Sequence, residues 1–213
     1  MFIRTLLTTA GFLCMASFSQ AATVAEVFNG DMLDTNQRYF ESVAGIPRKS
    51  FDDVHEFRVQ GCEIKATVSD GRIAKLRLEI TPTCTADLTT FIGGYAPAPE
   101  QPLTLGALDP ATYYADCLTM CGNAYEPSMY AHWHGPRAVD HLEVLLETRI
   151  SSDKAIDASF IWQKHMEKAM GEDWILETRF NCDKRFNDVA EKVLRDVPVT
   201  AVKIGRDLST PGC

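Results

Sequence analysis

The chain lacks the short motifs by which many enzyme classes are recognised. No serine lies in a Gly-x-Ser-x-Gly setting, and no cysteine lies in a protease-like motif. Neither a phosphate-binding loop nor a dinucleotide-binding fingerprint is present. These absences argue against the hydrolases, nucleotide-binding enzymes and dehydrogenases that carry such motifs. The sequence therefore favours a non-catalytic protein, and an enzyme with another kind of site stays open.

Clusters of basic residues and long apolar runs are also missing. The chain has 21 Lys and Arg against 29 Asp and Glu, a formal net charge of −8, and no basic patch along the sequence. Nucleic acid and anionic membranes are therefore poor candidate partners. No apolar segment reaches the roughly 20 residues that a membrane-spanning helix needs. We expect no membrane insertion, and we expect the partner to be another protein.

The first 21 residues have the three parts of an export signal. Arg4 precedes an apolar stretch over residues 6–18, and Ser19-Gln20-Ala21 forms a small-x-small ending. This pattern predicts a cleavable signal peptide over residues 1–21 and a periplasmic or secreted protein. No Asn-x-Ser/Thr acceptor site for glycosylation is present, which fits a bacterial periplasm.

Six cysteines follow the predicted signal peptide, and an even number in an exported chain predicts three disulfides. They are Cys62, Cys84, Cys117, Cys121, Cys182 and Cys213. Chain order suggests Cys62–Cys84 and Cys182–Cys213, which leaves Cys117 with Cys121, although six cysteines allow 15 connectivities. A redox role for Cys117 and Cys121 is the alternative, but their spacing is not Cys-x-x-Cys.

The first predicted module spans residues 22–92 and joins a helix to antiparallel strands. Asp34 is a suitable N-cap for a helix that ends at Gly45. Alternating apolar residues over 57–68 predict strand structure, with a bulge at Gly61 where the alternation changes phase. An Asp70-Gly71 turn then leads into a partner strand over residues 73–80.

A second module over residues 109–213 follows a Pro- and Gly-rich linker at 93–108. The sequence predicts a helix that begins at Asp109-Pro110 and ends at Gly122, and then strands over 128–134 and 139–149. A C-terminal extension has two helices, over about 158–171 and 186–194, and a strand over 199–204. The whole is predicted to be a disulfide-stabilised α+β protein in which helices pack on one face of an antiparallel sheet. The two modules are either related helix-plus-hairpin halves or a chance succession of similar elements.

One segment carries a family resemblance. A short helix that ends at Gly45-Ile46-Pro47, an aromatic-led strand, a tight turn and a further strand resemble the module of small outer-membrane assembly lipoproteins and of secreted β-lactamase inhibitor proteins. The resemblance covers about residues 33–80, with a fainter echo over 108–150. It implies a non-catalytic binding scaffold, such as a periplasmic inhibitor or an envelope accessory protein. The chain lacks the lipid-attachment cysteine of the first group, so membrane anchoring is not implied.

The strongest candidate for metal chemistry is a histidine-rich hairpin. Residues two apart on a strand face the same side, so His132 and His134 form one pair, and His141 with Glu143 forms another. If the two strands are in register, these groups make a ligand set suited to zinc or copper. The alternative function is thus a metal-dependent enzyme or a metal-binding protein; without this site, no cofactor is expected. A half-exposed sheet with alternating polar residues explains the same pattern.

A second candidate is a binding face of aromatic and arginine residues. Tyr125, Tyr130, Trp133 and Arg137 are types that are enriched at the centres of protein interfaces. Packing of the same aromatic residues in the core is the other interpretation.

Overall fold

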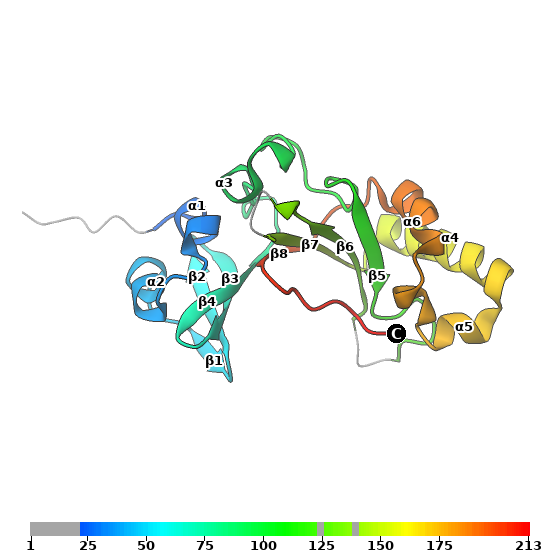
Figure 1. Cartoon of the computed structure of the whole chain (residues 1–213), viewed down its shortest axis with the longest axis horizontal. Helices are drawn as coiled ribbons and strands as arrows, with labels where there is room; N and C mark the ends of the chain where they lie inside the picture. Colours follow the sequence, from blue (N-terminus) through cyan, green and yellow to red (C-terminus); the bar gives the residue numbers. More distant parts are fainter. Residues whose placement is uncertain (1–21, 123–125, 138–140) are drawn as a thin grey trace, which may run out of the picture.

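A computed structural model describes residues 22–122, 126–137 and 141–213, so the predicted signal peptide lies outside the described residues. The protein is α+β, as predicted, and eight antiparallel strands form a sheet in the order β1-β2-β3-β4-β8-β7-β6-β5 (Figure 1). The strands are β1 (Lys49–Phe51), β2 (Val54–Val59), β3 (Cys62–Ser69), β4 (Arg72–Glu79), β5 (Ala111–Ala115), β6 (Ser128–His134), β7 (Glu143–Arg149) and β8 (Ala201–Gly205).

Helices flank this sheet. The α-helices are α1 (Val24–Val27), α2 (Gln37–Ala44), α3 (Thr89–Ile92), α4 (Asp153–Met170), α5 (Glu172–Leu176) and α6 (Asn187–Leu194). Short 3₁₀ turns are η1 (Gly30–Met32), η2 (Gly93–Tyr95), η4 (Arg179–Cys182) and η5 (Lys184–Phe186). Helices α4, α5 and α6 gather at the β5 end of the sheet, whereas α1 and α2 lie at the opposite end (Figure 1).

Strand β8 connects the two halves of the chain. It pairs with β4 on one side and with β7 on the other, so that Ile204 lies opposite both Leu76 and Val144. The strands of residues 22–92 and those of residues 109–149 therefore form two contiguous blocks of one sheet. The last strand in the sequence lies between them.

The two faces of the sheet differ in chemistry because side chains alternate along each strand. One row across the strands consists of Ala66, Leu76, Ile204, Val144 and Trp133, each at most 2% exposed. The next row, on what we call the polar face, consists of Lys65, Arg77, Lys203, Leu145 and His132.

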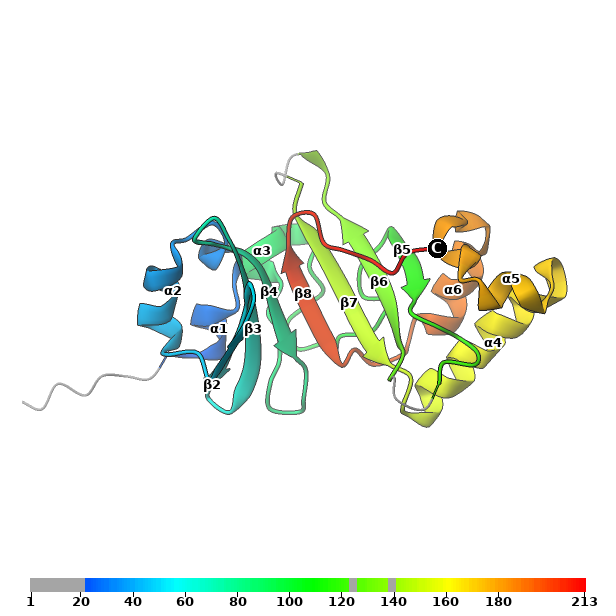
Figure 2. The ribbon, with the colours of Figure 1, turned by 90° about the horizontal axis from the view of Figure 1, so that it is seen from below.

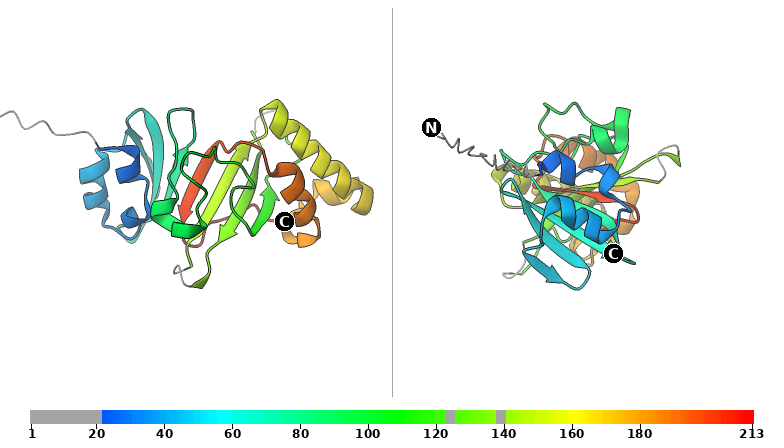
Figure 3. Two further views of the ribbon diagram at one scale, coloured as in Figure 1. Left: turned by 90° about the horizontal axis from the view of Figure 1, so that it is seen from above. Right: turned by 90° about the vertical axis from the view of Figure 1, so that its left-hand side faces the viewer.

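Different segments cover the two faces. Helices α1, α2 and α3 lie on the apolar side (Figure 3), whereas the chain after Gly205 crosses the opposite, polar face (Figure 2). The expected covering of one face by helices is thus found at the β1–β4 end.

Local signals predicted the ends of the two best-defined helices. Helix α2 ends at Gly45, whose φ of 91° suits glycine, and α4 ends at Gly171 with a φ of 89°. The predicted N-cap at Asp34 was wrong by two residues, because the side chain of Asn36 accepts the backbone N–H of Arg38.

The phase change at Gly61 comes from a turn. Gln60 and Gly61 have φ values of 50° and 88° and connect β2 to β3, so the predicted bulge there is wrong. Two successive residues with positive φ form the tight hairpin turn that suits the twist of antiparallel strands. The register shift lies instead between Thr67 and Val68. The predicted Asp70-Gly71 turn joins β3 to β4.

The predicted helix over 109–122 is wrong, because residues 111–115 form strand β5. Tyr113 and Ala115 are buried at two-residue spacing, and the Thr-Tyr-Tyr sequence favours extended structure. Described residues 96–110 contain no helix either, and the helices of this half follow β7. The predicted order of a helix over 109–122 followed by a hairpin is therefore not found, and the short helix α3 (Thr89–Ile92) precedes β5 instead.

The segment predicted as a linker, residues 93–108, packs closely against the protein. Leu105 and Leu108 are at most 2% exposed. The backbone N–H of Leu105 donates to the carbonyl of Val197, and that of Val199 donates to Leu103. Its prolines thus shape an ordered connection that runs beside the chain leading into β8.

Three disulfides join Cys62 to Cys84, Cys117 to Cys121 and Cys182 to Cys213, the pairing suggested by chain order. A strained bridge on a helix is avoided because Cys117 and Cys121 lie in the loop after β5. Three disulfides are consistent with an oxidising space outside the cytoplasm. Among the described residues, no helix combines the length and the apolar character needed to cross a membrane.

A buried asparagine closes the β5 edge of the sheet. The side chain of Asn181 accepts the backbone N–H of Ala115 and donates to the carbonyls of Ala115 and Gly212, at 2.9–3.0 Å. Asn187 accepts the backbone N–H of Tyr113 at 3.4 Å. These side chains form hydrogen bonds with backbone N–H and C=O groups of β5 that could otherwise pair with a strand of another molecule.

We predict that Asn181→Ala lowers the free energy of unfolding by about 2–4 kcal/mol, because it leaves buried backbone groups without partners. Urea denaturation measures the change. Asn187→Ala, which removes a single longer hydrogen bond, is the matched control and should cost less than about 1 kcal/mol. If both variants lost the same free energy of unfolding, the proposed role of Asn181 at the β5 edge would be wrong.

Candidate metal centre

Three of the four predicted metal ligands meet on the polar face. His132 and His134 project from β6 to the same side, and Glu143 begins β7 directly opposite His134. Nε2 of His132 lies 2.9 Å from Oε2 of Glu143, and Nδ1 of His134 lies 3.7 Å from Oε1 of the same residue. One candidate ligand atom from each of the three side chains lies within 4.8 Å of the others. The register of β6 with β7, which cannot be read from the sequence, thus places Glu143 beside both histidines.

The fourth predicted ligand, His141, does not belong to this group. Strand β7 begins only at Glu143, and His141 lies in the preceding turn with a φ of 55° and an exposed side chain. Its backbone is not extended, so the two-residue alternation that would align it with Glu143 does not apply. The prediction of His141 as a ligand is therefore wrong.

His132 occupies an unusual environment for an imidazole. The residue is 3% exposed, and its ring stacks at an angle on that of His134, with centroids 3.9 Å apart. Nδ1 is buried and has no hydrogen-bond partner among the described residues. A buried polar atom without a partner costs free energy, and such atoms call for a functional explanation.

Burial lowers the pKa of His132 below its ordinary value, and the adjacent His134 lowers it further. The hydrogen bond and the charge of Glu143 act in the opposite direction but are outweighed. His132 is consequently neutral at neutral pH, and neutral imidazole is the form that binds metal ions.

The donor set fits a divalent transition metal. Two imidazoles and a carboxylate suit zinc and copper, whose bonds to such ligands are about 2.0–2.2 Å long. Ligand atoms within 4.8 Å of one another can reach one ion with small side-chain movements. His134 has a 57% exposed side chain and leaves an approach from solvent, whereas the side chain of Glu143 is 13% exposed.

One contact of this site has no signal in the amino-acid sequence. The backbone N–H of Leu208 donates to Oε2 of Glu143 at 2.8 Å, and Leu208 is 6% exposed. Residues 206–213, which we call the C-terminal strap, cross β7, β6 and β5 on the polar face (Figure 2). The predicted pairing of Cys213 indicated that this end of the chain is attached, but not which surface it covers.

The predicted aromatic binding face is not one surface. Tyr130 and Trp133 are three residues apart on β6 and therefore point to opposite sides of the sheet. Trp133 is 2% exposed and packs against Tyr95, whereas the Tyr130 hydroxyl donates to Asp116 on the polar face. Arg137 is exposed, and Tyr125 lies outside the described residues. Core packing thus explains Trp133.

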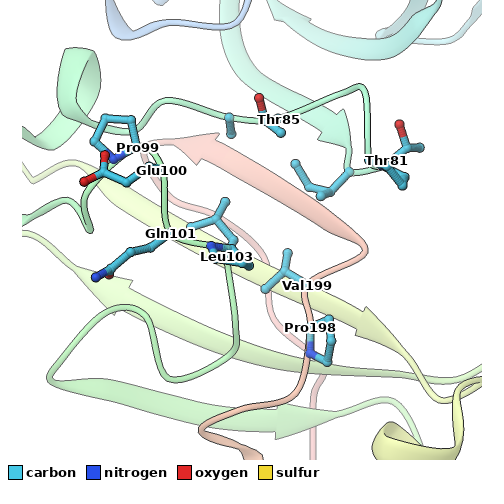
Figure 4. A pocket seen from close by; sticks show the side chains of 12 residues that line it. Thr81, Thr85, Pro99, Glu100, Gln101, Leu103, Pro198 and Val199 are labelled. Carbon is cyan, nitrogen blue, oxygen red and sulfur yellow. The ribbon is translucent and has the colours of Figure 1, made fainter.

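A cavity of about 470 Å³ lies where the two blocks of strands meet, close to the entry into β8 (Figure 4). Three segments line it, from residues 80–86, 99–103 and 198–199. Four of the lining residues are prolines, which offer no N–H, and Ile80, Leu103 and Val199 add apolar surface. The lining of the cavity therefore suits an apolar ligand group. Glu100 is the one acidic residue among the lining residues.

Comparisons of the chain with family models, curated proteins and solved structures find no match. The resemblance to assembly lipoproteins and β-lactamase inhibitors therefore stays a prediction. The geometry of the described residues is what bears on function.

The lowered pKa of His132 predicts a pH dependence of stability in the metal-free protein. As the pH falls, His132 takes up a proton near pH 6.5 in the unfolded state and only at a lower pH in the folded state. The free energy of unfolding therefore keeps the whole contribution of His132 above pH 6.5 and decreases as the pH falls below it. Urea unfolding between pH 5 and 8 should show wild type losing stability relative to His132→Gln as the pH falls. His141→Gln is the control and should follow wild type; parallel curves for wild type and His132→Gln would refute the prediction.

Proposed function

We propose that this is a periplasmic or secreted protein that binds a divalent transition metal, zinc or copper, through His132, His134 and Glu143. The observation that carries the proposal is the convergence of the three ligand atoms within 4.8 Å. From the sequence alone, metal binding is the alternative to a non-catalytic binding protein. The positions of the three side chains on β6 and β7 support metal binding. Export, predicted from residues 1–21, fits the three disulfides.

Two further observations support the metal-binding role. His132 is buried beside Glu143, and burial lowers its pKa, so it offers the neutral imidazole that binds metal ions. Glu143 is itself oriented by the Leu208 N–H, and hydrogen bonds to ligating carboxylates are usual around metal ions. Three protein ligands leave at least one coordination position for water or another molecule.

Titration calorimetry of the stripped protein with Zn(II) and Cu(II) tests this proposal. We expect one ion per chain, and a loss of affinity of about 100-fold or more in His132→Ala and Glu143→Gln. His141→Ala is the matched control, because this histidine lies outside the group, and it should bind as wild type does. Absence of heat at micromolar metal, or equal losses in His141→Ala, would reject the site.

A second candidate function is favoured by the apolar cavity between the blocks of strands. We propose that the protein is a non-catalytic binding protein, such as a periplasmic inhibitor or envelope accessory protein, that receives an apolar side chain of another protein there. A cavity of about 470 Å³ is large enough for an aromatic or aliphatic anchor residue, and its proline-rich lining is already ordered.

Crosslinking in the envelope, followed by isolation of the partner, tests this second function. Leu103→Lys places a charge in the cavity and should lower recovery of the crosslinked partner about tenfold or more. Ile46→Lys changes a residue that is 90% exposed and lies outside the cavity, so it should leave recovery unchanged. Unaltered crosslinking of Leu103→Lys would exclude the cavity as the contact.

A further inference from the structure

The C-terminal strap is fastened to the polar face at several points. Beyond the bond from Leu208 to Glu143, Lys75 on β4 donates to the carbonyl of Asp207 at 2.7 Å, and Tyr114 on β5 lies beside Thr210. Asn181 donates to the carbonyl of Gly212, and Cys213 is then bonded to Cys182. The strap thus lies over β7 and β6, which carry the metal ligands, and over β5 (Figure 2).

The covalent anchor of the strap is also the most accessible disulfide. Cys182 and Cys213 are both exposed, whereas Cys62 is 2% and Cys84 is 5% exposed. Cys117 and Cys121 are half-buried. Thiol–disulfide exchange requires a thiolate to reach a sulfur, so exposure favours attack on Cys182–Cys213 first.

We propose that the Cys182–Cys213 disulfide is a redox latch for the metal site: while it is closed, the strap holds Glu143 through Leu208, and its reduction loosens the strap and weakens metal binding. This inference rests on the proposed metal-binding function and adds a means of controlling it. The reductant belongs to the class of dithiols, as carried by thioredoxin-like proteins.

The chemistry of the latch is ordinary thiol–disulfide exchange. A thiolate of the dithiol attacks one sulfur, forms a mixed disulfide and displaces the other cysteine as a thiolate, which takes up a proton. The second thiolate of the reductant then resolves the mixed disulfide. Overall, two electrons and two protons pass from the dithiol to Cys182 and Cys213, and the reductant leaves as its own disulfide.

Opening the latch should lower affinity because of what the strap does to Glu143. The Leu208 N–H fixes Oε2, which Nε2 of His132 also contacts in the metal-free protein, and Oε1 on the side of His134 stays open to an ion. Without Cys182–Cys213, residues 209–213 keep the bond from Asn181 to Gly212, and Lys75 still donates to the carbonyl of Asp207 before Leu208. Residues 209–213 then gain conformational freedom, and the Leu208 N–H is held less firmly against the carboxylate.

The experiment compares wild type, Cys182→Ser/Cys213→Ser and the matched control Cys117→Ser/Cys121→Ser, which opens a disulfide outside the strap. Zinc affinity is measured by calorimetry on each stripped protein, and exchange of the Leu208 amide hydrogen is measured without metal. We expect the latch variant to bind zinc about 10-fold or more weakly, because loss of an outer-sphere partner typically costs 10–100-fold. Its Leu208 amide should exchange at least about 10-fold faster, and the control should match wild type in both measurements.

A second measurement avoids dependence on one variant. Wild type is treated with increasing dithiothreitol, and peptide mapping identifies the first disulfide to open; Cys182–Cys213 should open first, together with faster Leu208 exchange. Equal zinc affinity in wild type and the latch variant would overturn the inference and leave the metal site standing. If intact wild type binds no zinc, the proposed function and the control of affinity both fail, and the Leu208 exchange then reports only whether the disulfide fastens the strap.

Discussion

The pairing of β8 with both β4 and β7 is the interaction on which the rest of the molecule depends. Ala201, Val202 and Ile204 are fully buried, and each is flanked by a partner strand on both sides. This pairing turns two blocks of strands into a continuous eight-stranded sheet with one apolar side. It also directs the chain after Gly205 across the polar face, so the contact of Leu208 with Glu143 follows from the position of β8.

The polar face is stable because its charges are paired across strands. Arg77 on β4 makes hydrogen bonds of 3.0–3.1 Å to Glu147 on β7, across the backbone of β8, and contacts Glu79 on its own strand. Glu79 also pairs with Arg149. Between them, Lys203 has a pKa lowered by burial, partly offset by the charge of Glu147. The histidine and glutamate group lies beside this ion-paired region and differs from it, since His132 is a neutral and incompletely bonded group within the same face.

Patterns that depend on neighbouring residues were readable from the sequence. The glycine ends of α2 and α4, the Asp70-Gly71 turn and the alternation along β6 all express local geometry, and the cysteines pair in chain order. The helix predicted over 109–122 failed because Tyr113, Cys117 and Cys121 lie at helical spacing along the chain, whereas Tyr113 and Ala115 are buried at strand spacing in the finished sheet. Likewise, His132 and His134 could be placed on one side from sequence, but only the register of β6 with β7 brings Glu143 to them and leaves His141 aside. Contacts such as Leu208 with Glu143 join residues 65 positions apart and have no local signal.

The place of β8 also determines the order in which the sheet can be completed. A chain that is synthesised from its amino end completes β4 about 120 residues, and β7 about 50 residues, before β8 begins. Until β8 is present, the open edges of these two strands offer unpaired N–H and C=O groups, which attract strands of other molecules. The growing chain is therefore vulnerable to aggregation until β8 fills the gap. Any factor that shields open strand edges before then would protect the chain.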